Sequence, residues 1–170
     1  MLERSSVLEH SSASRKETST AWIIIKYRRT TKMIIDANNL ILGRLGTFVA
    51  KKALLGEKID IVNCENAVVT GDKYDIFRKY DKLLHRGTPA KGPFTRKMPD
   101  RFVKRAIRGM LPYKKGRGRE AFKNIKCYMG VPDNLKEQKR DTIQEANAEK
   151  LPNMKYVTIK EVCMHIGANL

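Results

Sequence analysis

The densest cluster of charged side chains in this sequence places four cations within six residues: Lys114, Lys115, Arg117 and Arg119. Gly116 and Gly118 separate these cations. Ammonium and guanidinium groups bind phosphate oxygens, and glycines let the backbone approach a phosphate at little steric cost. The pattern predicts an exposed phosphate-binding loop over residues 113–119, although basic runs can also be plain solvated linkers. We expect this loop to stay extended until phosphate arrives, because its like charges repel one another.

The cluster belongs to a longer basic region, residues 85–126, with fourteen Lys and Arg but only two acids. This region supplies +12 of the formal net charge of +17. Concentrated positive charge repels itself, and a polyanion that releases counterions on contact relieves that repulsion. A nucleic-acid backbone is therefore the expected partner. The other side chains expected to contact it are Arg86, Lys91, Arg96, Lys97, Arg101, Lys104, Arg105 and Arg108.

Alternating strand and helix patterns must position these side chains, and they predict an α/β fold that begins with a parallel βαβ unit. Strands are expected at residues 33–37, 58–64, 67–70, 126–129 and 156–159. Helices are expected at residues 42–55, 73–84, 99–108, 120–125, 141–149 and 159–166.

The expected helix over residues 99–108 has two distinct faces. Its apolar stripe comprises Phe102, Val103, Ala106, Ile107 and Met110, and its basic ridge comprises Arg101, Arg105 and Arg108. The stripe should pack on the core while the ridge faces solvent. Phe94 lies in the Gly- and Pro-interrupted loop before this helix. It either stacks on an unpaired base or packs under its own loop, and the sequence leaves both open.

Several other kinds of site and protein are disfavoured by the sequence. Gly43-Arg44-Leu45-Gly46 lacks the spacing of a dinucleotide loop, and its glycines should instead allow close helix–sheet packing. The carboxylates that a metal would need each have an ordinary role at a strand end, turn or helix start: Asp36, Glu65, Asp72 and Asp75. We therefore expect no catalysis, no cofactor, no metal and no small-molecule substrate. A nucleotide-using enzyme that depends on Asp36 or Gly43 is the remaining catalytic alternative.

The apolar runs and the cysteines bear on location. The longest apolar runs are about five residues, such as 21–25, far below the roughly 20 needed to span a bilayer or the roughly 7–15 of a signal-peptide core. We expect a cytoplasmic protein with no membrane partner. Cys64, Cys127 and Cys163 are widely spaced, without a C-x-x-C pair, and should be reduced, mostly buried thiols.

Four stretches of the sequence together resemble one protein family: Ile35–Ala37 with Leu42–Leu45, Val62–Ala67, Arg108–Lys114 and Tyr128–Pro132. The run Arg-Gly-Met-Leu-Pro at residues 108–112 is the most specific of them. Residues 33–170 are similar to large-subunit ribosomal protein thirteen, a universal family, in its archaeal form. Gly46-Thr47 departs from the Ala-Ser that is common in the family.

The resemblance implies a three-layer α/β/α fold around a four-stranded parallel sheet, with a basic helix-loop extension. It implies a structural constituent of the large ribosomal subunit that binds and stabilises large-subunit rRNA, during assembly and in the mature ribosome. Its partners would be that rRNA and neighbouring large-subunit proteins, and its location the cytoplasmic ribosome. A non-ribosomal RNA-binding regulator that uses the same basic surface is the alternative.

The chain divides at residue 33. Residues 1–32 are polar and low in complexity and should form a disordered extension, whereas residues 33–170 should form a single domain that includes the basic region. Met33 stands where members of the family usually begin, so we expect an upstream start-site extension. The chain ends soon after the last expected helix, without the basic extension of eukaryotic relatives, which favours an archaeal source.

Overall fold

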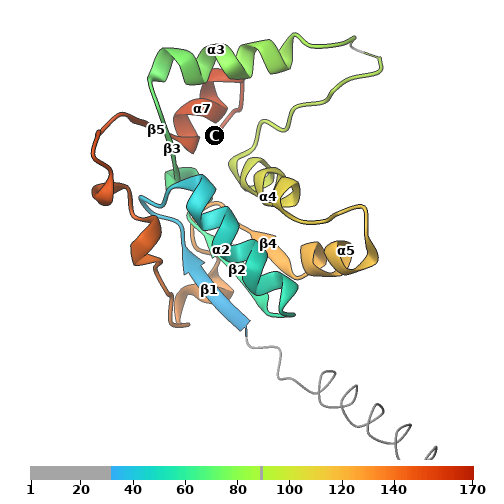
Figure 1. The fold of residues 1–170 in the computed structure, drawn as a ribbon. Helices are drawn as coiled ribbons and strands as arrows, with labels where there is room; N and C mark the ends of the chain where they lie inside the picture. The colour runs from blue at the N-terminus through green and yellow to red at the C-terminus, as the bar shows by residue number, and fades with distance from the viewer. Residues whose placement is uncertain (1–31, 89) are drawn as a thin grey trace, which may run out of the picture. The chain divides into compact units, whose positions relative to one another are not determined.

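A computed structural model describes residues 32–88 and 90–170 of this chain. The predicted N-terminal extension therefore lies outside the described residues, except for Lys32. Three strands form a parallel sheet in the order β1-β2-β4: β1 Lys32–Asp36, β2 Lys58–Val62 and β4 Ile125–Cys127 (Figure 1). Their apolar residues, among them Ile35, Ile59 and Ile61, are fully buried.

Helix α2, Leu42–Leu54, connects β1 to β2 and confirms the predicted βαβ unit. Leu45 and Val49 on its inner face are fully buried, as the helical spacing predicts. Gly56 follows the helix at a φ of +94°, a left-handed conformation that glycine adopts without steric cost. The chain can therefore reverse direction within a few residues and enter β2.

The parallel sheet has three strands in the described residues, where the family resemblance implies four. The fourth position, beside β1, is filled by one residue, Asp141. Its N–H donates to the carbonyl of Ile34 at 2.8 Å, and its carbonyl accepts from the N–H of Asp36 at 3.1 Å. The α/β class and the parallel sheet are thus confirmed. The four full strands and the three layers are not.

The helix predicted over residues 141–149 is wrong. After a short helix α6, Asp133–Lys136, this segment forms two 3₁₀ turns, η2 Gln144–Ala146 and η3 Ala148–Lys150. Its backbone bonds to another segment: Ile41 N–H donates to the Ala146 carbonyl and Ala148 N–H donates to the Asn39 carbonyl. Those groups are then unavailable for the i→i−4 bonds of an α-helix.

A separate antiparallel pair, β3 Val68–Thr70 and β5 Tyr156–Thr158, accompanies two helices. These are α3, Lys73–Leu84, and α7, Ile159–His165, which Figure 1 shows side by side. The His165 ring stacks on Phe77 with centroids 4.2 Å apart, and its Nε2 lies 3.0 Å from a carboxylate oxygen of Asp81. The last helix is therefore fixed to α3 by aromatic and polar contacts.

Helix α4, Pro99–Met110, packs against α2, and α5, Gly116–Lys123, follows it. Phe102, Val103 and Ile107 of the predicted apolar stripe are buried, while Met110 is partly exposed. A Cβ at Gly46 would lie 2.8 Å from the Met110 Sδ, so this glycine admits a helix–helix contact. The predicted helix–sheet role of the Gly43 and Gly46 pair is wrong, since nothing lies within 4 Å of a Cβ built at Gly43.

No helix among the described residues combines the length and the apolar character needed to cross a membrane.

Candidate nucleic-acid interface

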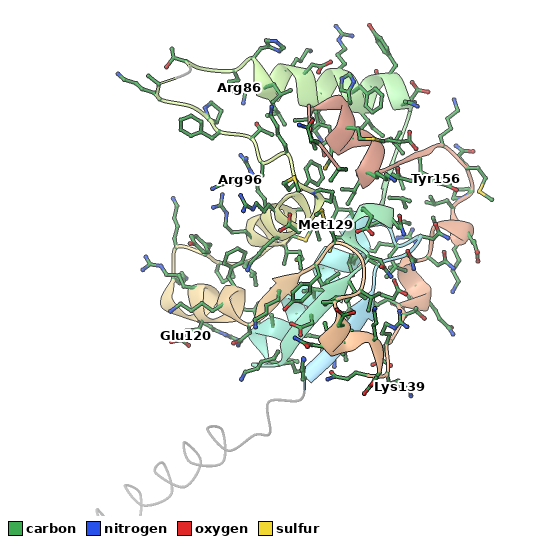
Figure 2. All side chains as sticks on the ribbon, turned by 180° about the vertical axis from the view of Figure 1, so that it is seen from behind. Arg86, Arg96, Glu120, Met129, Lys139 and Tyr156 are labelled. Carbon is green, nitrogen blue, oxygen red and sulfur yellow. The ribbon has the colours of Figure 1, made fainter. Side chains whose placement is uncertain are left out.

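The basic ridge of α4 faces outward as predicted. Arg101, Arg105 and Arg108 are exposed, and the opposite face of the same helix is buried against the core. Proline at the first helical position and Asp100 in the first turn both suit a helix start. An amphipathic helix anchored on its apolar side thus presents three guanidinium groups to solvent. Figure 2 shows Arg86, Arg96 and Glu120 on one side of the view, which marks the course of the basic region.

An open hollow of about 470 Å³ lies along this ridge. Five cations and two aromatic rings line it: Phe94, Arg96, Arg101, Lys104, Arg105, Arg108 and Phe122. They come from α4, from α5 and from the loop before α4. The structure therefore gathers five of the twelve predicted cations into one concave, positively charged surface.

Aromatic side chains hold two of these cations in place. Lys104 Nζ lies 5.0 Å from the centroid of the Phe122 ring, and the Arg108 guanidinium carbon lies 5.4 Å from that of Tyr113. The two rings meet edge to face, with centroids 5.4 Å apart. Cation–π attraction and ring packing orient long side chains that would otherwise be mobile. This role of Phe122 and Tyr113 is not predictable from the sequence, because the two rings lie in different elements.

Phe94 is 67% exposed, so its own loop does not cover the ring. Arg105 Nη1 donates a hydrogen bond to its carbonyl oxygen at 2.9 Å, which ties the loop to α4. The alternative that Phe94 packs under its own loop is therefore wrong, and its ring is open to a partner.

The predicted basic loop is only partly a loop. Lys114 and Lys115 lie in the turn after α4, but Gly116 begins helix α5, so Arg117 and Arg119 are exposed on its first turn. Gly118 is buried, and a Cβ there would overlap the Pro112 carbonyl oxygen. The sequence predicts that both glycines let the backbone approach a phosphate. Gly118 instead allows α5 to pack closely on the turn that precedes it.

Besides the four cations of residues 114–119, three further predicted cations lie away from the hollow. Lys91 is exposed in the loop, and Lys97 Nζ lies 3.4 Å from where a Cβ at Gly167 would be, near the end of α7. Arg86 lines a second open hollow, of about 500 Å³, along α3. Its other lining residues are Asp75, Arg78, Lys79, Lys82 and Leu83. The cations of α3 are not among the predicted contacts, although Arg78, Lys82 and Arg86 recur every four residues.

Three of the four carboxylates considered for metal binding have internal partners. Asp36 accepts from Asn63 Nδ2 at 2.9 Å and from the N–H of Asn38 at 3.1 Å. Glu65 accepts from the Gly130 N–H at 3.0 Å. Asp72 accepts from the Tyr74 N–H at 3.2 Å and caps α3. Each acts in a turn or a helix start, as predicted.

The three cysteines are free thiols, of which Cys64 and Cys163 are buried. Burial raises the pKa of the Cys163 thiol to about 12. The pKa of Cys64 is also raised, by a hydrogen bond with Cys127 and then by burial. Both thiols are therefore protonated near neutral pH and poor nucleophiles.

Comparison with known proteins fits the motifs seen in the sequence. The family model described as "Ribosomal protein L13" matches residues 30–134. The chain is similar to proteins named "Large ribosomal subunit protein uL13" from three archaea. It is 45% identical to that of Archaeoglobus fulgidus over 135 residues, which are 79% of this chain and 86% of the relative. It is 43% identical to that of Methanococcoides burtonii, over 79% of this chain and 97% of the relative. It is 46% identical to that of Methanosarcina barkeri, over 79% and 97% respectively. This chain belongs to the ribosomal protein L13 family.

Proposed function

We propose that this chain is a structural constituent of the large ribosomal subunit that binds and stabilises large-subunit rRNA, during assembly and in the mature particle. The observation that carries the proposal is the hollow beside α4, where five cations converge on one surface. Phosphate oxygens are the natural partners of such a surface, because they neutralise it and release counterions. Membership of the L13 family supports large-subunit rRNA as the RNA partner.

The proposed contact surface comprises the twelve predicted cations, out of the fourteen in the basic region. Those in the hollow form its centre, and Lys114, Lys115, Arg117 and Arg119 extend it along the turn and the start of α5. The cations of α3 add a second contact area near Arg86. Residues 33–170 act as one domain in this proposal, and neighbouring large-subunit proteins complete the set of partners in a cytoplasmic ribosome. The three-layer family fold around a four-stranded sheet is part of this proposal, and the bridge at Asp141 supports its fourth strand position.

Sedimentation tests the proposal. Tagged chain should co-sediment with the large subunit in a sucrose gradient at native salt. Replacing Lys114, Lys115, Arg117 and Arg119 with Glu should move nearly all of it to the top of the gradient. The matched control changes Lys139, Arg140, Lys150 and Lys155 to Glu, four exposed cations outside the basic region. It alters the net charge equally and should still co-sediment.

Wild-type chain that stays at the top of the gradient would contradict the proposal. A sequence-specific RNA target outside the ribosome would then favour the regulator. The ribosomal names of the relatives favour the structural role.

A further inference from the structure

The two aromatic rings that line the hollow differ in what already covers them. The Phe122 ring has Lys104 Nζ near one face and the Tyr113 ring in edge contact, and most of its surface is within the protein. Phe94 is 67% exposed. An exposed phenyl ring beside five cations is a poor arrangement for phosphate binding alone, because phosphate gains nothing from an apolar face.

The loop around Phe94 is built to hold the ring in this position. Arg105 fixes its backbone by the 2.9 Å hydrogen bond to the carbonyl oxygen. The ring edge rests on Gly92, where a Cβ would lie 3.1 and 3.2 Å from ring atoms. Gly92 also has a φ of +83°, which L side chains rarely adopt. A side chain at residue 92 would therefore crowd the Phe94 ring, which lines the hollow.

We propose that this hollow binds one unpaired nucleotide of the RNA, with its base stacked on Phe94 and its phosphates on the guanidinium groups of α4. The inference rests on the proposed RNA-binding function and specifies the form of RNA that the site takes. Bases in an A-form duplex are stacked on one another, so a protein ring reaches the face of a base only where the strand is unpaired. Stacking on an aromatic ring is tolerant of base identity, because every base has a π face.

The dimensions and the charge agree with such a ligand. A volume of about 470 Å³ falls in the range of roughly 300–1,000 Å³ that small-ligand sites occupy. Arg101 and Arg108 are exposed along the ridge beside the ring. A nucleotide carries both an apolar face and an anionic backbone, and this hollow offers a partner for each.

The test measures binding of the full chain to two fluorescent probes: a 12-nucleotide single-stranded RNA, and the same strand annealed to its complement. Phe94→Leu keeps an apolar side chain but removes the ring. It should weaken binding of the single strand by about 5- to 150-fold, the effect of losing one stacked base, and leave duplex binding unchanged. Phe94→Trp should retain single-strand binding. Added RNA should quench the tryptophan fluorescence of this variant more strongly than that of the wild type. Arg101→Gln should weaken both probes by similar factors.

If Phe94→Leu weakens the binding of both probes equally, or of neither, the proposal of a stacked nucleotide is wrong, while the proposed RNA binding stands. Loss of single-strand binding in Phe94→Trp would also overturn the stacked nucleotide. Failure of the wild type to bind either probe would overturn the proposed function as well. The thermal midpoint of each variant shows whether it is folded, and we expect little change because Phe94 is largely exposed.

Discussion

Arg105 and Phe94 are joined by a hydrogen bond from the guanidinium Nη1 to the backbone carbonyl oxygen, 2.9 Å long. The bond links α4, which is anchored in the core through Val103 and Ile107, to an irregular loop. One arginine thus contributes charge to the hollow and also fixes the segment that carries the exposed ring. The neighbouring Arg101 lines the same hollow.

Substitution of Arg105 by Gln should loosen the loop as well as weaken RNA binding. The bond is exposed to solvent, so its loss should cost about 0.5–1.5 kcal/mol, as for an ordinary hydrogen bond, and make local opening roughly 2- to 12-fold more frequent. Hydrogen–deuterium exchange of residues 90–98 should rise by that factor. Arg101→Gln removes the same charge and should leave the exchange of this loop unchanged. Equal exchange in the two variants would contradict the positioning role of Arg105.

Gly118 should be far less tolerant of substitution than Gly116, two residues earlier in the same helix. A Cβ at Gly118 would overlap the Pro112 carbonyl oxygen, whereas nothing lies within 4 Å of one at Gly116. Gly118→Ala should lower the free energy of unfolding by about 1–3 kcal/mol, the usual cost of overpacking. Gly116→Ala should change it by no more than about 0.5 kcal/mol. Urea denaturation of both variants measures the difference, and equal stabilities would show that α5 does not pack on the turn as described.

Alkaline pH should destabilise the protein partly through Cys163. Its pKa is raised by burial from 9.0 to about 12, so the folded state keeps a proton that the unfolded state loses above pH 9. The stabilisation is fully present below pH 9 and is lost between pH 9 and 12, at up to about 1.4 kcal/mol per pH unit. Urea denaturation under reducing conditions should show a shallower decline for Cys163→Ala than for the wild type. Parallel declines would contradict the assignment.

The fold and the site were predictable from the sequence where local pattern and tertiary packing agree. Leu45 and Val49 recur at helical spacing in α2, and the structure buries both. The start of α5 was missed because Gly116, Arg117 and Gly118 disfavour a helix, by propensity and by cations at its positive end. Close packing of Gly118 on Pro112 outweighs that preference.

Prediction of the site was likewise limited to features that the local sequence carries. The count of cations between residues 85 and 126 was enough to locate the basic surface. The contact between the Phe122 and Tyr113 rings was not predictable, because it depends on how the turn between α4 and α5 folds. The cations of α3 are less conspicuous in the sequence, because Asp75 and Asp81 offset half of the charge of its four Lys and Arg. In the structure His165 lies within 3.0 Å of the Asp81 carboxylate, while Arg78 and Lys82 line an open hollow.

The dependence of rRNA affinity on salt tests the central claim most directly. Each phosphate contact contributes roughly 0.7–0.9 to the slope of log K against log salt, so about six contacts would weaken binding of an rRNA transcript roughly 10³-fold between 50 and 200 mM. Changing Arg101, Arg105 and Arg108 to Gln should reduce the slope by about 2–3. Changing Lys139, Arg140 and Lys150 to Gln should leave it unaltered; Figure 2 shows Lys139 and Arg96 on opposite sides of the view. Binding that ignores salt, or an equal reduction of the slope in both triple variants, would contradict the account.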